Sequence, residues 1–84
     1  MSLTLKDYRK FFTYNELQVE LINAEALELY WFKAMNTYDD KANGYYDGYN
    51  YNRCRNNAMK VTTTIKRINK VLEEKTKWEN ITTL

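Results

Sequence analysis

The sequence has 84 residues and a mass of 10.2 kDa, which fits one domain that buries about 60–65% of the surface of its unfolded chain. It contains no histidine, no proline and one cysteine, so histidine-based catalytic pairs, internal disulfides and multi-cysteine zinc sites are excluded. The net charge of +2 divides unevenly, because residues 1–40 carry four basic and seven acidic side chains, whereas residues 41–84 carry nine and four. The first half is therefore acidic and the second basic, which favours their pairing with each other over an exposed basic face for a polyanion.

A short helix is predicted over residues 4–12. Thr4 is followed three residues later by Asp7, which is typical of a capping box at a helix start. Four apolar residues then follow at helical spacing: Leu5, Tyr8, Phe11 and Phe12. The same threonine-acid spacing recurs at Thr13 and Glu16, so a second helix is predicted over residues 14–38.

The second helix is apolar around most of its circumference. A single helical hairpin buries only one face of each helix. This helix is therefore expected to contact the other two helices and a second copy of the chain. After it, Asn43 and Gly44 tolerate a positive φ, which predicts a tight turn between two helices.

A third helix is predicted over residues 47–77 and carries a regular apolar seam. Its members alternate at spacings of three and four: Tyr51, Cys54, Ala58, Val61, Ile65, Ile68 and Leu72. Antiparallel folding brings this seam against one on the second helix: Leu17, Leu21, Ala24, Glu28, Trp31, Met35 and Tyr38. The register places Leu17 near Ile68 and Glu28 near Ala58. Glu28 then either reaches solvent past the small alanine or pairs with Arg55.

The predicted fold is all-α, a single domain over residues 1–84. It is an antiparallel helical hairpin with a short N-terminal helix, coiled-coil-like packing and an oligomeric state. The seam residues that we expect to form the core or an oligomer contact are Leu17, Leu21, Trp31, Met35, Tyr51, Val61, Ile65, Ile68 and Leu72. The tail carries Trp78, Ile81 and Leu84, and it either extends the third helix or folds back over the core.

The segment 45–55 is the strongest candidate for a binding surface. It holds four of the eight tyrosines and two arginines, which are residue types enriched in binding hot spots and able to stack on bases. The candidate partner-binding residues are Tyr45, Tyr46, Tyr49, Arg53, Lys60 and Arg67. A solvated helix face, a protein-binding surface and a nucleic-acid site all fit this pattern.

Catalysis, a metal site and a cofactor are not expected. Four charged side chains interrupt the most apolar stretch, residues 17–35, which argues against a membrane span. The start of the chain lacks the basic-then-apolar order of a secretion signal, so a cytoplasmic location is expected.

In composition the chain resembles short phage or mobile-element proteins. The resemblance rests on its small size, ten asparagines, many lysines and tyrosines, no proline, and the run Gly-Tyr-Tyr-Asp-Gly-Tyr at 44–49. It implies a non-catalytic helical module that binds one host protein or complex and blocks it, as anti-defence and anti-CRISPR inhibitors do. Two alternatives remain open: a small nucleic-acid-binding protein that uses Arg53, Lys60, Arg67 and Lys70, and a structural coiled-coil subunit.

Overall fold

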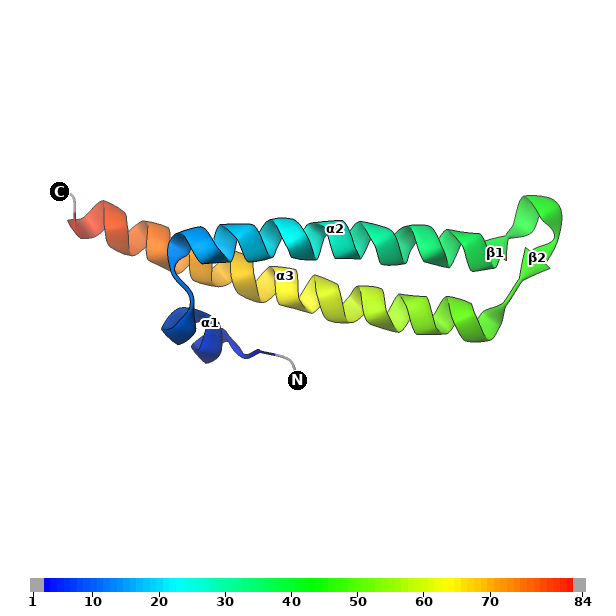
Figure 1. Cartoon of the computed structure of the whole chain (residues 1–84), viewed down its shortest axis with the longest axis horizontal. Helices are drawn as coiled ribbons and strands as arrows, with labels where there is room; N and C mark the ends of the chain where they lie inside the picture. Colours follow the sequence, from blue (N-terminus) through cyan, green and yellow to red (C-terminus); the bar gives the residue numbers. More distant parts are fainter. Residues whose placement is uncertain (1–2, 83–84) are drawn as a thin grey trace.

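Two long helices lie side by side and antiparallel, and a short helix packs at one end of the pair (Figure 1). The computed structural model describes the backbone of residues 3–82 and the side chains of residues 3–77. The helices are α1 (Leu5–Phe11), α2 (Tyr14–Tyr38) and α3 (Gly48–Thr82). The molecule measures 60 × 24 × 14 Å. The predicted all-α helical hairpin with a short N-terminal helix is confirmed.

Both predicted capping boxes are present. The Thr4 hydroxyl accepts a hydrogen bond from the backbone N–H of Asp7, and the Asp7 carboxylate accepts one from the backbone N–H of Thr4. Thr13 and Glu16 repeat this exchange at the start of α2. The hydrogen bond from a backbone N–H to each carboxylate lowers the pKa of Asp7 and Glu16. Each helix start thus has its otherwise unpaired N–H groups partly satisfied by its own sequence.

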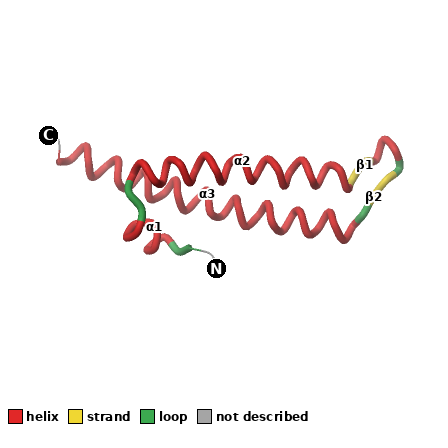
Figure 2. Tube along the Cα trace, viewed as in Figure 1, coloured by secondary structure: helices red, strands yellow, loops and turns green. Residues whose placement is uncertain are grey.

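The connection between the long helices is longer than the predicted tight turn and contains secondary structure of its own. It contains strand β1 (Asp39–Asp40), the 3-10 helix η1 (Lys41–Asn43) and strand β2 (Tyr45–Tyr46), which pairs antiparallel with β1 (Figure 2). Gly44 ends η1 with a φ of 70°, in the left-handed region that glycine adopts without a steric penalty. The strand pair forms because the Tyr-Tyr dipeptide is extended, which the prediction of a tight turn did not include.

The strand pair sets the register of the whole hairpin. Asp39 lies opposite Tyr46, and the backbone N–H of Asp47 donates to the carbonyl of Tyr38 at 2.8 Å. Because both long helices rise equally per residue, the same register continued along them brings Leu17 level with Ile68. These two side chains belong to one buried cluster.

The tightest core lies at the end of the hairpin where α1 packs. Tyr8, Leu17, Ile68 and Val71 are buried together there. Partly buried side chains pack around them: Leu5, Phe12, Leu21, Ala24 and Leu72. The Arg9 guanidinium forms two hydrogen bonds to the Glu74 carboxylate, at 2.6 and 2.7 Å, and so ties α1 to α3. Phe11, which the sequence places on the apolar face of this helix, is instead 65% exposed.

Along the rest of the hairpin the seam is only partly covered. Cys54 and Ala58 are buried, whereas other seam residues are half-buried: Trp31, Met35, Tyr51, Val61 and Ile65. Glu28 adopts neither of its two expected arrangements. Its Oε2 accepts a hydrogen bond from the Thr62 hydroxyl at 2.6 Å, because α3 presents that threonine one turn beyond Ala58.

Charge pairing between the halves of the chain is sparse. Among the side chains that the structure describes, the ion pairs are Arg9–Glu74 and Lys77–Glu73, and neither joins α2 to α3. The two long helices therefore associate through their apolar seam and the Thr62–Glu28 hydrogen bond, not through paired charges.

The tail continues α3 through Thr82. Of the apolar residues expected to direct it, Leu84 lies outside the described residues, as do the side chains of Trp78 and Ile81. Over the described part of the chain, no helix combines the length and the apolar character that crossing a membrane needs.

Candidate partner-binding surface

Three tyrosines are displayed at the turn end of the hairpin. Tyr45 and Tyr46 form β2, and Tyr49 follows in the first turn of α3. Their exposed fractions are 48%, 62% and 80%, so Tyr45 is about half exposed and the other two are mostly exposed. Arg53 is also exposed and lies one helical turn beyond Tyr49. The structure thus brings four of the six predicted binding residues to one end of the molecule.

Local hydrogen bonds and ring contacts hold this end in place. The Asp40 carboxylate accepts from the Asn43 side chain at 2.7 Å, and the Asp47 carboxylate accepts from the backbone and side chain of Asn50. The backbone N–H of Asn50 is the main reason that the pKa of Asp47 is lowered. These contacts begin α3 directly after β2 and fix the direction in which the tyrosines leave the backbone.

Tyr46 is further restrained by its neighbours. Its ring lies 5.9 Å from that of Tyr51, and its Cε1 comes within 3.2 Å of the place where Gly48 would carry a Cβ. Gly48 therefore gives the Tyr46 ring room to lie against the start of α3. This restraint lowers the entropy that the ring would lose on binding a partner.

An open hollow of about 360 Å³ adjoins the tyrosines. It is lined by Asp39, Lys41, Tyr46 and Tyr51. Asp39 Oδ1 is buried, and no described protein group donates a hydrogen bond to it. The lining combines a carboxylate, the Lys41 ammonium and two aromatic rings, and the carboxylate and rings attract cations such as arginine and lysine side chains. Sequence reasoning missed the hollow, because it depends on the strand pair.

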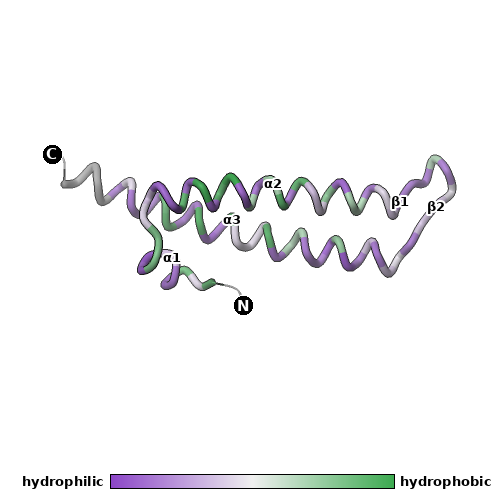
Figure 3. The backbone as a smooth tube through the Cα atoms, viewed as in Figure 1, coloured by the Kyte–Doolittle hydropathy of each residue, from purple (hydrophilic) through white to green (hydrophobic). Residues whose placement is uncertain are grey.

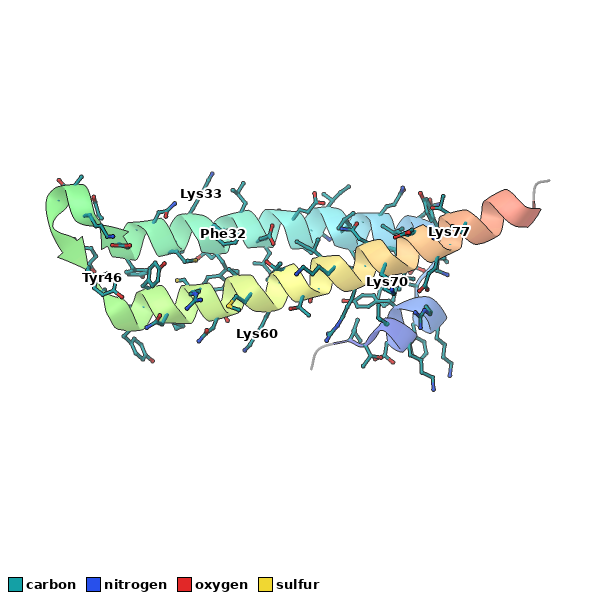
Figure 4. All side chains as sticks on the ribbon, turned by 180° about the vertical axis from the view of Figure 1, so that it is seen from behind. Phe32, Lys33, Tyr46, Lys60, Lys70 and Lys77 are labelled. Atoms are coloured by element: carbon teal, nitrogen blue, oxygen red, sulfur yellow. The ribbon has the colours of Figure 1, made fainter. Side chains whose placement is uncertain are left out.

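The predicted binding residues Lys60 and Arg67 lie farther along α3 than the tyrosines. Arg53 and Lys60 are exposed on α3, and Figure 4 shows Lys60 projecting away from α2. Arg67 is half-buried and its Nη1 donates to the Leu3 carbonyl at 3.0 Å, so it helps to hold the segment before α1. It also lies about 27 Å along the helix from Tyr49. Arg67 therefore belongs to the fold and not to the surface around the tyrosines.

A second exposed surface lies on α2, and the sequence analysis did not name it as a distinct surface. We call it the outer α2 stripe: Val19, Ile22, Ala26 and Leu29. Its larger members are 55–66% exposed. Figure 3 shows hydrophobic segments recurring along α2, whereas α3 is mostly hydrophilic toward the turn. The signal was present, since these residues follow their own alternation of three and four on a face that the seam does not use.

No protein-family model matches the chain, and neither a curated protein nor a solved structure matches it. The functional argument therefore rests on the geometry of the chain itself. Within the described side chains, no three cysteine, aspartate or glutamate residues gather closely enough to hold a metal ion.

Proposed function

We propose that the protein is a non-catalytic helical binding module that inhibits or modulates a host protein or complex by covering its working surface. The compositional resemblance to phage accessory proteins supports an anti-defence role of the anti-CRISPR type, exerted in the host cytoplasm. The tyrosine-bearing end of the hairpin contacts the partner, and the two long helices act as the rigid body behind it.

The observation that carries this proposal is the display of Tyr45, Tyr46 and Tyr49 at one end of a hairpin whose turn is fixed by hydrogen bonds. Exposed tyrosines supply large contact areas at low entropy cost, and each also has a hydroxyl that can pair with a polar group. Arg53 adds a planar cation one turn away, which suits a carboxylate on the partner.

The lining of the hollow beside the tyrosines indicates which kind of partner side chain would fit there. The Asp39 carboxyl group and the rings of Tyr46 and Tyr51 line this hollow, together with Lys41. We expect the partner surface to present an arginine or lysine side chain there, which the carboxylate and the tyrosine rings attract. Asp39→Asn keeps the shape of the side chain but removes its charge, so it should weaken partner binding without altering the turn.

The direct test is affinity capture from host cytosol with the full chain as bait, before and after nuclease treatment. Tyr49→Ala removes an 80% exposed ring and should reduce capture about tenfold or more. Phe11→Ala is the matched control, because it removes a 65% exposed aromatic ring from α1, at the other end of the hairpin. Equal capture by the two variants would contradict the proposal, provided that both keep the helicity of the wild type.

A nucleic-acid-binding role is the second candidate. It is favoured by the exposed cations of α3, namely Arg53, Arg55, Lys60, Lys66, Lys70 and Lys77. Phosphate contacts make affinity fall steeply between low and physiological salt, whereas a tyrosine-anchored protein interface changes little. Capture that disappears after nuclease treatment and at physiological salt, and that Lys60→Gln weakens, would favour this role.

A further inference from the structure

The outer α2 stripe faces away from α3. Its residues, extended by Asn15 and Lys33 at the two ends, alternate at spacings of four and three. At about 100° per residue, the stripe is centred about 170° around the helix from the seam that packs on α3. Figure 4 agrees, since Lys33 points away from α3, and α1 lies on the other side of α3 (Figure 1). Nothing within the described chain covers this face.

The molecule exposes more surface than a compact monomer of its mass. Its accessible surface is 6513 Å², whereas a compact 10.2 kDa monomer exposes about 5,300 Å². Its radius of gyration is 16.9 Å, whereas a compact chain of this length has about 12 Å. The excess of about 1,200 Å² exceeds the roughly 800 Å² that each partner buries in a standard interface. This excess reflects the open, elongated hairpin, which leaves the outer side of α2 accessible to a second copy along its length.

Two copies of the stripe are complementary in shape when their helices run antiparallel. About a two-fold axis level with residue 24, Ile22 of one copy lies opposite Ala26 of the other, and Val19 lies opposite Leu29. The small alanine faces the branched isoleucine on both sides of the axis, which lets two helices approach closely. At the ends, Lys33 comes level with Asn15 of the other copy, so no like charges meet at the ends of the stripe.

We propose that two copies of the chain associate through the outer α2 stripe, with their α2 helices antiparallel about a two-fold axis level with residue 24. The assembly is a row of four helices in which the two α2 helices are central and the two α3 helices are outermost. This pairing does not depend on the proposed function, because the tyrosine-bearing end lies outside the stripe. The alternatives are a parallel pair, a pair formed through the groove beside Leu27, and a monomer.

The first test is the molar mass of the full chain by light scattering at micromolar concentrations. The wild type should give twice 10.2 kDa. Val19→Asp places a charge in the stripe and should raise the dissociation constant about 100-fold or more. Met59→Asp is the matched control, since both residues are 56% exposed but Met59 lies on α3. Circular dichroism must show equal helicity in both variants. A wild type that stays at 10.2 kDa overturns the proposal.

The second test separates this face and direction from the alternatives. A mixture of Ile22→Cys chains and Ala26→Cys chains should form a mixed intermolecular disulfide, because in the antiparallel pair these two positions face each other across the axis. Val19→Cys alone should not cross-link, because its two copies lie about 15 Å apart along the helices. Native Cys54 is buried and does not interfere. Cross-linking of Val19→Cys with itself would show a parallel pair and overturn the register. A dimer that resists Val19→Asp but is broken by Leu27→Asp would overturn the choice of face.

The register also predicts one unfavourable contact. Glu25 lies beside its own copy at the axis, where two carboxylates repel each other. Glu25→Gln should therefore tighten the dimer about twofold to fivefold at low salt. Glu20→Gln, on the flank nearer to α3, should leave the dissociation constant unchanged. A looser dimer or no change with Glu25→Gln would contradict this register.

Discussion

Arg9 and Glu74 make the one described ion pair that joins residues far apart in the sequence. The guanidinium of Arg9 donates to both carboxylate oxygens of Glu74, a geometry stronger than a single-point pair. The hydrogen bond from Arg9 is the main reason that the pKa of Glu74 falls below its ordinary value of 4.5. At the scale of single residues, this contact ties α1 to α3 beside the buried Tyr8.

We predict that Glu74→Gln lowers the melting temperature at neutral pH. A carboxyl group whose pKa is lower in the folded chain stabilises the fold above its unfolded value of about 4.5. That contribution is lost as the pH falls through the lower folded value. The difference from wild type should therefore be present at pH 7 and shrink toward zero in acid. Thermal melts across this pH range measure it.

Glu73→Gln is the control for that prediction. Glu73 pairs with Lys77 one turn away on the same helix, and both side chains are about two-thirds exposed or more. Such pairs contribute little to stability. A loss with Glu73→Gln as large as that with Glu74→Gln, or a Glu74→Gln effect that persists unchanged in acid, would contradict the assigned role of Arg9.

At the scale of elements, α2 starts where it does because of Thr13. Its hydroxyl accepts a hydrogen bond from the backbone N–H of Glu16, and the Glu16 carboxylate accepts one from the backbone N–H of Thr13. Thr13→Ala should lower the free energy of unfolding by about 1 kcal/mol in urea titrations. Thr63→Ala is the control, because Thr63 is an exposed threonine inside α3, where alanine is the better helix former. Equal destabilisation by the two variants would be inconsistent with a capping role.

The helices could be predicted from the sequence because their signals are local. Thr4 and Thr13 each carry a capping partner three residues on, and the α3 seam follows an unbroken heptad. The strand pair could not be predicted, since it depends on Tyr45 and Tyr46 meeting β1 after the turn has closed. The contact that Arg67 makes could not be predicted either, because it is nonlocal: its guanidinium donates to the Leu3 carbonyl, in the segment before α1.

The outer α2 stripe shows a different limit of the sequence reading. An apolar side chain in a helix favours burial, but its identity alone does not tell which element, or which other chain, packs against it. The seam spacing includes Leu17 and leaves out Val19, and in the structure Leu17 is fully buried whereas Val19 is 56% exposed. The spacing alone does not show whether another part of the same chain packs on Val19.

At the scale of the whole molecule, the chain is an elongated hairpin with two distinct exposed surfaces. One is the outer α2 stripe, which is apolar and complementary to itself. The other is the turn end, which carries tyrosines, an arginine and a carboxylate oxygen that lacks a donor. Because these two surfaces do not overlap, the chain can bind a second copy through the outer α2 stripe and a partner through the turn end at the same time.

The central claim is that the turn end, and not the rest of the hairpin, contacts the partner. It is tested most directly by photo-crosslinking in host cells, with a photoreactive phenylalanine derivative placed at Tyr49 or, separately, at Phe11. Both positions are exposed and aromatic, so each replacement is expected to leave the fold intact. The account predicts a discrete adduct with one host protein from position 49 and none from position 11. The same adducts from both positions, or adducts from position 11 alone, would contradict it.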